Sequence, residues 1–406
     1  MDSDRQPPQL PELPPDASIP ERVRWARQYA GLTQQELAGR LNYSPSWVRH
    51  LEAGRGRDPQ PAVLQRIAEV CKVDPGRLLG RRTTVSTAPD PSHEHPLIAP
   101  IRRAMVGRPT GDAWEVERLD RVVGDLFNTW QSRSATRMVD VARELPTVVT
   151  QLRLHDGNQE AAGPVTAGWH LVRAAGKKLH GLDLTHVAAD RAARVSLNSG
   201  DLGLEMLASW NAGQATSHAG WTEEALFIVS EAIEAGRPYI ADGPTSLRAI
   251  WGNLHLSAAV LRGRMDDFDR ADELLTEADR IAATTGEHNA YRAAFGPSNV
   301  GIHALTMWME AGRYDRARKI ADQVDATRNP SIERQFAYAL HSAAIYVGLK
   351  QDVAALAMLQ RAWAATPEET TLNPLARQLV GGLLRRETPA VKEDLRPLAL
   401  GMRLIA

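Results

Sequence analysis

A pattern that recurs every 46 residues most strongly constrains the fold of this 406-residue chain. The matching residues are Asn253, Ala258 and Asp269-Arg270-Ala271, which recur without a gap as Asn299, Ala304 and Asp315-Arg316-Ala317. The flanking apolar residues have helical spacing in the paired stretches 254–262 and 269–282, 300–310 and 315–324, and, more loosely, 338–347 and 352–365. One such pair cannot bury its apolar side alone, whereas a stack of pairs builds a continuous core. The sequence therefore predicts a superhelix of helical hairpins.

The inner, concave face of such a stack is the expected place for a ligand, along the first helix of each pair. The polar and aromatic candidates for this face are Trp210, Asn211, Trp251, Asn253, His255, Asn299, His303 and His341. Asparagine offers both a donor and an acceptor to a peptide backbone. In the alternative interpretation, the asparagines bond to neighbouring connections and the tryptophans only pack.

The stretch Gly312–Ala317, Gly-Arg-Tyr-Asp-Arg-Ala, resembles tetratricopeptide repeats. A period of 46 residues exceeds the ~34 of that family and implies longer connections. From about residue 112 onward, nearly every segment has helical spacing and no alternating run typical of a strand occurs. The resemblance covers about residues 200–366, and together with the helical spacing it predicts an all-helical, tetratricopeptide-like domain over residues 98–406.

The charge of the chain is unevenly distributed. The total of 48 basic and 49 acidic residues gives a net charge of −1, but residues 20–82 carry twelve basic and six acidic side chains. The near-neutral total thus conceals a segment of net charge +6, the sign that a nucleic-acid partner requires.

This basic segment predicts five short helices bounded by capping signals. The first spans about Glu21–Ala30 and ends at Gly31, and Thr33 with Glu36 forms a capping box that opens the second. Ser44 and Pro45 open the third, Pro61 the fourth and Asp74-Pro75 the fifth. Pro-rich residues 1–19 read as a disordered tail, and residues 81–97 as a linker.

The caps, apolar positions and glycines of residues 20–80 together resemble the Cro-like, or XRE-type, helix-turn-helix family of phage repressors. The residues that carry this resemblance are Gly31 to Ala38, Ser44, Val48, Leu51, Glu52 and Gly54. The resemblance implies a lambda-repressor-like DNA-binding domain whose third helix enters the major groove of double-stranded DNA.

The DNA contacts implied by this resemblance lie on the second and third helices and on the basic loop after them: Gln34, Ser44, Pro45, Ser46, Trp47, Arg49, His50, Arg55 and Arg57. Many members carry a hydrogen-bonding side chain where this chain has Pro45, which offers only apolar contact. Base reading should therefore shift to Arg49, whose bidentate guanidinium suits guanine. Trp47 either packs on the sugar-phosphate backbone or covers the turn.

Catalytic motifs are absent from the sequence: no phosphate-binding glycine loop, His-Glu-x-x-His motif, paired-cysteine cluster or nucleophile elbow occurs. We expect no enzyme activity, no cofactor and no metal, because the His93-x-His95 pair has no third ligand nearby. Cys71 is expected in the core. The N-terminus lacks a signal peptide and no run of ~20 apolar residues occurs, which predicts a cytoplasmic protein.

A Cro-like head with a tetratricopeptide-like body resembles the peptide-sensing RRNPP regulators of Gram-positive bacteria and the repeat-containing regulators of actinobacteria. The resemblance implies a homodimeric transcriptional regulator whose body senses a peptide or small molecule. The alternative is an interaction scaffold, in which the body docks a partner protein and the head only localises it on DNA.

Overall fold

The chain divides into two compact units, residues 1–88, here called the head, and residues 89–406, here called the body. The computed structural model describes residues 17–41, 43–54, 61–71, 73, 78, 94–386 and 389–405. The predicted tail, the fifth helix of the head and the linker therefore lie wholly or largely outside the described residues, as does His93. Each unit is described by itself.

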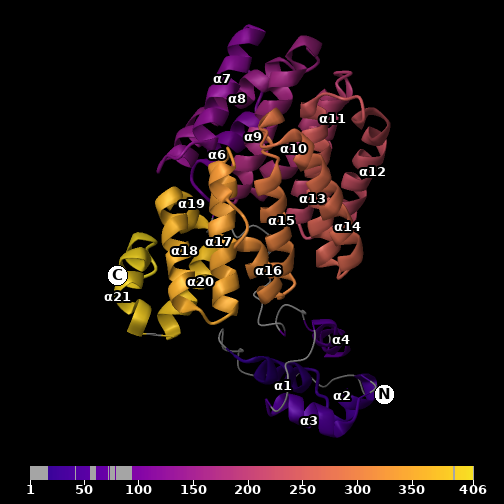
Figure 1. The fold of residues 1–406 in the computed structure, drawn as a ribbon, viewed down its shortest axis with the longest axis vertical. Coiled ribbons are helices and arrows are strands. Elements are labelled where there is room, and N and C mark those ends of the chain that lie inside the picture. Colours follow the sequence, from indigo (N-terminus) through magenta and orange to yellow (C-terminus); the bar gives the residue numbers. More distant parts are fainter. Residues whose placement is uncertain are drawn as a thin grey trace. The chain divides into compact units, whose positions relative to one another are not determined.

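The head contains four described helices, and their bounds are α1 Ile19–Tyr29, α2 Gln34–Leu41, α3 Pro45–Glu52 and α4 Pro61–Cys71 (Figure 1). Both predicted helix starts at Thr33 and Ser44 are confirmed. The backbone N–H and the hydroxyl of Thr33 bond to the Glu36 carboxylate at 2.7 and 2.8 Å, and Glu36 N–H bonds back to the hydroxyl. A further capping box joins Ser18 and Glu21, so α1 begins two residues before the predicted position.

The body is all-helical, and no strand forms in its described residues. Its helices before the repeat are α6 Ile98–Val106, α7 Val116–Gln131, α8 Arg137–Leu154, α9 Ala162–Lys178, α10 Leu182–Leu197, α11 Leu202–His218 and α12 Thr222–Ile240. The remainder are α13 Thr245–Arg264, α14 Phe268–Thr285, α15 Pro297–Glu310, α16 Tyr314–Ala321, α17 Ile332–Gly348, α18 Asp352–Ala365, α19 Pro367–Leu372, α20 Pro374–Arg386 and α21 Pro389–Gly401. Short 3₁₀ turns lie at residues 159–161, 290–292 and 326–328.

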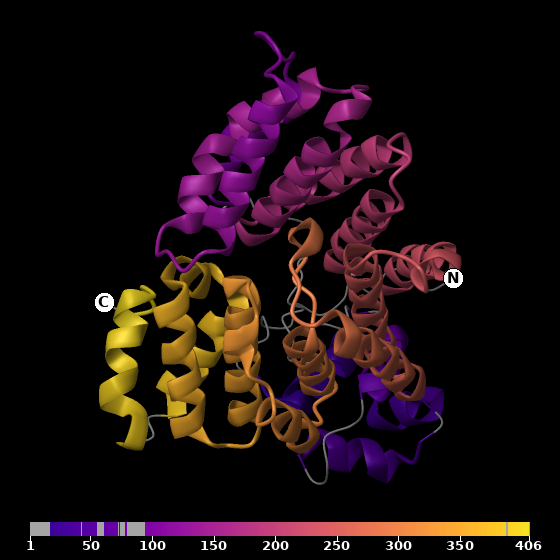
Figure 2. The same cartoon turned by 45° about the horizontal axis from the view of Figure 1, so that its top comes forward.

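Consecutive helices of the body pack as hairpins, as the repeat predicted. Each odd-numbered helix from α9 to α17 pairs with the even-numbered helix after it, and the odd-numbered helices also contact one another in order. The 46-residue period relates α13–α14 to α15–α16, although α13 begins nine residues before the predicted Leu254. The odd-numbered helices therefore line the inner side of the stack (Figure 2).

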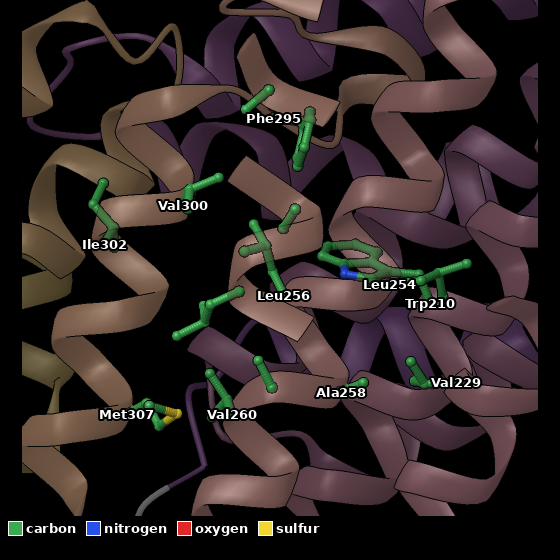
Figure 3. Packing of buried hydrophobic residues seen from close by; sticks show 14 of the residues in the cluster. Trp210, Val229, Leu254, Leu256, Ala258, Val260, Phe295, Val300, Ile302 and Met307 are labelled. Carbon is green, nitrogen blue, oxygen red and sulfur yellow. The ribbon is translucent and has the colours of Figure 1, made fainter. Parts of the chain in front are cut away.

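Small residues and aromatic rings fit the hairpins together at the predicted repeat positions. Ala271 and Ala317 are fully buried where paired helices cross. Phe268 stacks on Trp308 of the next inner helix, with ring centroids 5.1 Å apart. Tyr314 occupies the corresponding position against Gly348, where an added Cβ would lie 2.5 Å from the ring. The apolar core between α11 and α17 follows the same stack (Figure 3).

A buried group of charges joins the early helices of the body to its late helices. The carboxylate of Glu369, at the start of α19, accepts from the Arg137 guanidinium of α8 and from the Lys178 ammonium of α9. Arg137 and Glu369 are 1% and 2% exposed at their side chains. The backbone N–H of Met138 adds a 2.9 Å bond to Glu368. We call Arg137, Lys178 and Glu369 the clasp, because they join segments about 190 to 230 residues apart.

Replacing Glu369 with Ala removes the shared partner of two cations. We expect Glu369→Ala to lower the free energy of unfolding of the body by about 3–5 kcal/mol, because a buried charge left without its partner is not solvated. Urea denaturation followed by circular dichroism measures this change. The control, Glu273→Ala, breaks the exposed pair with Arg270 and should cost under about 0.5 kcal/mol. Equal costs for the two variants would show that the clasp contributes no more than a surface pair.

Candidate functional site

The N-terminal end of α3 presents a polar surface at the edge of the head. Ser44 caps the helix, and its hydroxyl accepts from the backbone N–H of Trp47 at 3.2 Å and lies 2.9 Å from the Ser46 hydroxyl. Pro45 follows in the first turn, where the N–H that it lacks would have no helical partner. The cap therefore fixes which side of α3 faces outward.

The helical period sorts the side chains of α3 between core and solvent as predicted. Val48 and Leu51 are buried against the rest of the head. The exposed members are Ser44, Pro45, Ser46, Arg49 and His50. Arg49 and His50 lie one turn beyond the cap. These five residues form one accessible surface with donors, acceptors and a cation.

Trp47 is half-buried and stacks on Tyr43, with ring centroids 4.1 Å apart and planes inclined by 15°. The ring thus covers the start of α3, which is one of its two predicted roles. A contact between this ring and a sugar-phosphate backbone stays a prediction. Arg55 and Arg57, predicted to extend the surface, lie outside the described residues.

A buried carboxylate to which the sequence analysis assigned no structural role holds this surface in place. Glu52, the last residue of α3, accepts from Nε and Nη2 of the Arg27 guanidinium at 2.6 and 3.0 Å and from the Gln34 amide at 2.8 Å. Arg24 donates to the backbone carbonyl of Glu52 at 2.7 Å. These bonds join α1, α2 and α3. Gln34 thus packs against α3, while its contact with DNA stays a prediction.

Glu52 could have been recognised from its spacing. It lies four residues after Val48 and directly after Leu51, so a helical period places it on the buried side of α3. A charged residue at such a position requires a partner. Cys71 is buried as predicted, and burial raises the pKa of its thiol to about 11, which leaves it protonated at neutral pH.

Six of the eight candidate residues in the body are buried and contact other residues of the protein. Asn253 donates to the carbonyl of Ala293 at 3.0 Å, and Asn299 donates to the side-chain oxygen of Asn253 at 3.1 Å and to the carbonyl of Ala294 at 2.9 Å. The recurring asparagines thus bond to a neighbouring connection, as the alternative interpretation had it. Their predicted role toward an external peptide has to be corrected, because these donors already have partners.

The other four of these six pack within the core. Trp251 donates from its indole N–H to the carbonyl of Ile233 at 3.0 Å, and His255 bonds through Nδ1 to the carbonyl of Trp251. Asn211 accepts from Arg173 at 2.5 Å, and Trp210 is 5% exposed. Their burial corrects the prediction that these four face a ligand.

The connection held by the asparagines runs from Gly286 to Gly296 and crosses the inner side of the stack (Figure 2). Gln131 of α7 donates to its Arg292 carbonyl at 2.9 Å, and Asn289 bonds to Gln131 at 2.7 Å. Tyr291 and Arg292 both have left-handed backbone, with φ of 52° and 59°. Non-glycine residues keep such angles only where surrounding contacts compel them. This connection is here called the inner loop.

The last two candidates, His303 and His341, line a cavity of about 260 Å³ on the inner side of the body. Its walls come from five consecutive inner helices, α9, α11, α13, α15 and α17. The charged and imidazole side chains of the wall are Lys177, His218, Arg264, His303, Glu310, Arg334 and His341. The inner face, where the sequence predicted a ligand, therefore contains a cavity between these five helices.

Burial and neighbouring cations hold the imidazoles of this cavity neutral. The pKa of His303 is lowered to about 3 and that of His341 to about 4, chiefly because the rings are desolvated. The pKa of His218 lies well below its usual value for the same reason, with Lys177 adding repulsion. At neutral pH all three rings are uncharged.

Comparisons with known proteins bear on the two units differently. A family profile described as a helix-turn-helix domain matches residues 21–79, which include most of α1, all of α2 to α4 and the surface on α3. Residues 21–79 form a helix-turn-helix domain. Comparison with curated proteins by sequence finds no match.

Among solved structures, the chain resembles a tetratricopeptide repeat protein from Parabacteroides merdae at 11% identity and a TM-score of 0.36, covering 71% of this chain and 98% of that one. PlcR of Bacillus thuringiensis, solved with the peptide PapR7 and DNA, has 12% identity and a TM-score of 0.26, covering 66% and 94%. ComR of Streptococcus suis has 14% identity and a TM-score of 0.26, covering 83% and 94%. These superpositions are too loose to carry an argument.

No group of three metal-ligating side chains occurs in the described part of the chain. Over the same residues, no helix is both long enough and apolar enough to cross a bilayer.

Glu52 and Glu36 allow the buried and exposed carboxylates of the helix-turn-helix domain to be compared. We expect Glu52→Ala to lower the free energy of opening of α1 by about 3 kcal/mol, because Arg27 loses a buried partner. Glu36→Ala removes only part of an exposed capping box and should cost clearly less, because water solvates the groups left behind. Hydrogen exchange of α1 in the full chain measures both. A smaller effect of Glu52→Ala than of Glu36→Ala would refute the central role of Glu52.

Proposed function

We propose that this protein is a sequence-specific, DNA-binding transcriptional regulator whose body senses a ligand and mediates dimerisation. One observation carries the proposal: within a helix-turn-helix domain, α3 exposes Ser44, Pro45 and Ser46 at its start, with Arg49 and His50 on the same outward side in its last turn. Side chains at the start of a recognition helix are those that reach base edges in the major groove.

The charges of the helix-turn-helix domain also support binding to DNA. Residues 20–82, which contain the domain, carry six more basic than acidic residues, while the chain as a whole is near neutral. Arg24, Arg40, Arg49 and Arg66 are exposed. Counterion release by such cations drives binding to any sequence, whereas base contacts select one. We assign selection chiefly to Arg49, with Ser46 and His50 beside it, and the remaining cations to phosphate.

The body supplies the sensing part of the proposal. Its cavity is bounded by one side of five helices that belong to different hairpins, so a bound ligand contacts most of the stack at once. A ligand that favours one arrangement of the hairpins shifts the population toward it. In a homodimer, such a shift changes the spacing of two heads that must match half-sites about 34 Å apart.

Arg49→Ala tests the base-reading role. We expect a loss of about 1–3 kcal/mol on the preferred sequence and a weaker preference at one base position, because the bidentate contact to guanine is removed. Selection of DNA sites with the purified full chain identifies the sequence, and fluorescence anisotropy at fixed salt measures the affinities.

Arg194→Ala, at an exposed site on α10 of the body, is the matched control and should leave binding unchanged. If Arg49→Ala weakens binding to all sequences equally, Arg49 contacts phosphate and not a base. If the unaltered protein shows no preference among sequences, the scaffold alternative replaces the proposed regulator.

A further inference from the structure

The inner cavity contains more positive charge than its own acidic side chain can neutralise. Arg264 and Glu310 pair across the wall at 2.7 and 3.0 Å, and Arg264 also donates to the Ser217 hydroxyl. Lys177 and Arg334 line the same cavity from α9 and α17. Among the described residues, no hydrogen bond or ion pair engages the ammonium of Lys177 or the guanidinium of Arg334. Two cations therefore face the cavity unneutralised.

The desolvation of these cations is costly in the absence of an anion. Burial, together with the charges of Lys178, Arg173 and Arg334, holds the pKa of Lys177 well below its usual value. Burial likewise lowers the pKa of Arg334. Glu333 is the acidic neighbour that acts on both groups, and it lies 3.8 Å from Lys178. An anion in the cavity would offset the repulsion that remains.

The histidines of the cavity present a defined pattern of acceptors. Nδ1 of His218 bonds to the carbonyl of Gln214 and Nδ1 of His303 to the carbonyl of Asn299, so each Nδ1 carries the proton. The Thr306 hydroxyl donates to the carbonyl of Ile302, so it accepts from Nδ1 of His341 at 2.7 Å. Each neutral ring therefore keeps an Nε2 lone pair that can accept from a ligand.

We propose that this cavity binds a small organic anion, with its carboxylate or phosphate group at Lys177 and Arg334 and with N–H or O–H donors facing the histidines. The proposal rests on the proposed function, since it names the class of ligand that the body senses. A volume of about 260 Å³ lies below the ~300–1,000 Å³ usual for drug-sized ligands. The site therefore fits a small metabolite, or the charged end of a longer molecule.

Binding of an anion should draw protons into the cavity. A negative charge beside His303 or His341 favours the imidazolium form, and the same holds for the ammonium form of Lys177. The charged groups that act on them from the surrounding helices are Lys177, Lys178, Arg173, Arg264, Glu310, Glu333 and Arg334. Because the bound form takes up protons, affinity should fall as pH rises.

Calorimetric titration of the full chain with four probes tests this assignment without DNA. The probes are inorganic phosphate, succinate, trialanine with a free carboxylate and trialanine amide. We expect saturable binding of at least one anion and none of the amide. Repeating the titration in buffers of different ionisation enthalpy should reveal proton uptake. Succinate binding without trialanine binding identifies a small metabolite, and the reverse identifies a peptide end.

Lys177→Gln and Arg334→Gln should each weaken anion binding by roughly 10- to 100-fold, because each removes a charge-assisted hydrogen bond. Lys319→Gln and Arg121→Gln, at exposed positions on α16 and α7, are the matched controls and should bind as the unaltered protein does. The melting temperature of ligand-free Lys177→Gln should not fall, since a buried cation without a partner is removed; a structural role would lower it.

The proposal is overturned if none of the anions binds saturably, or if the amide binds as well as the free acid. It is equally overturned if the cavity variants bind like their controls. None of these outcomes involves DNA, so they leave base reading by the head untouched. Conversely, loss of sequence preference by the head would remove the regulatory role and leave anion binding intact.

Discussion

The buried carboxylate of Glu369 is the interaction on which the arrangement of the body depends. It draws Arg137 of α8 and Lys178 of α9 toward α19, so that helices far apart in sequence close the inner side of the stack. A buried ion pair of this kind is a poor source of net stability but a strict determinant of geometry, because either partner alone is costly. Lys178 of the clasp directly follows Lys177, which lines the cavity, so the clasp and the cavity wall share a segment of α9.

The inner side of the stack encloses a space, and the protein's own inner loop fills part of it. The inner loop occupies one part, where Asn253 and Asn299 satisfy its backbone carbonyls and Gln131 fixes it from α7. The strained backbone of Tyr291 and Arg292 is maintained by these contacts. The part between Lys177, His303 and Arg334 stays open. The proposed ligand site therefore lies in the region where cations, and not asparagines, line the wall.

Local sequence signals predicted much of the fold. The capping residues Thr33, Glu36 and Ser44 form hydrogen bonds with residues three positions away, so these caps can be predicted without knowledge of the tertiary structure. The hairpins followed from apolar period and from the repeated alanines at 271 and 317. Roles that depend on distant segments could not be predicted from the sequence. The partner of Asn253 lies 40 residues away, and the Arg137 partner of Glu369 lies 232 residues away.

The same division holds for the candidate sites. The outward side of α3 follows from its cap and its helical period, so its exposed residues could be named from the sequence. In the body, the first helix of each pair lies on the inner side as predicted, yet packing separates the eight candidates: two asparagines hold the inner loop, two histidines line the cavity and four residues lie in the core. Lys177 and Arg334 were missed, because only the absence of a partner in the fold distinguishes them from the many cations on exposed helix faces.

The central claim is that the body controls the head through a bound anion. Its most direct test is the affinity of the full chain for its selected DNA site, measured at fixed salt with and without a saturating anion from the calorimetric set. The account predicts a change of about 5- to 150-fold, with DNA changing the affinity for the anion by the same factor. Equal DNA affinities with the cavity occupied and empty would contradict it.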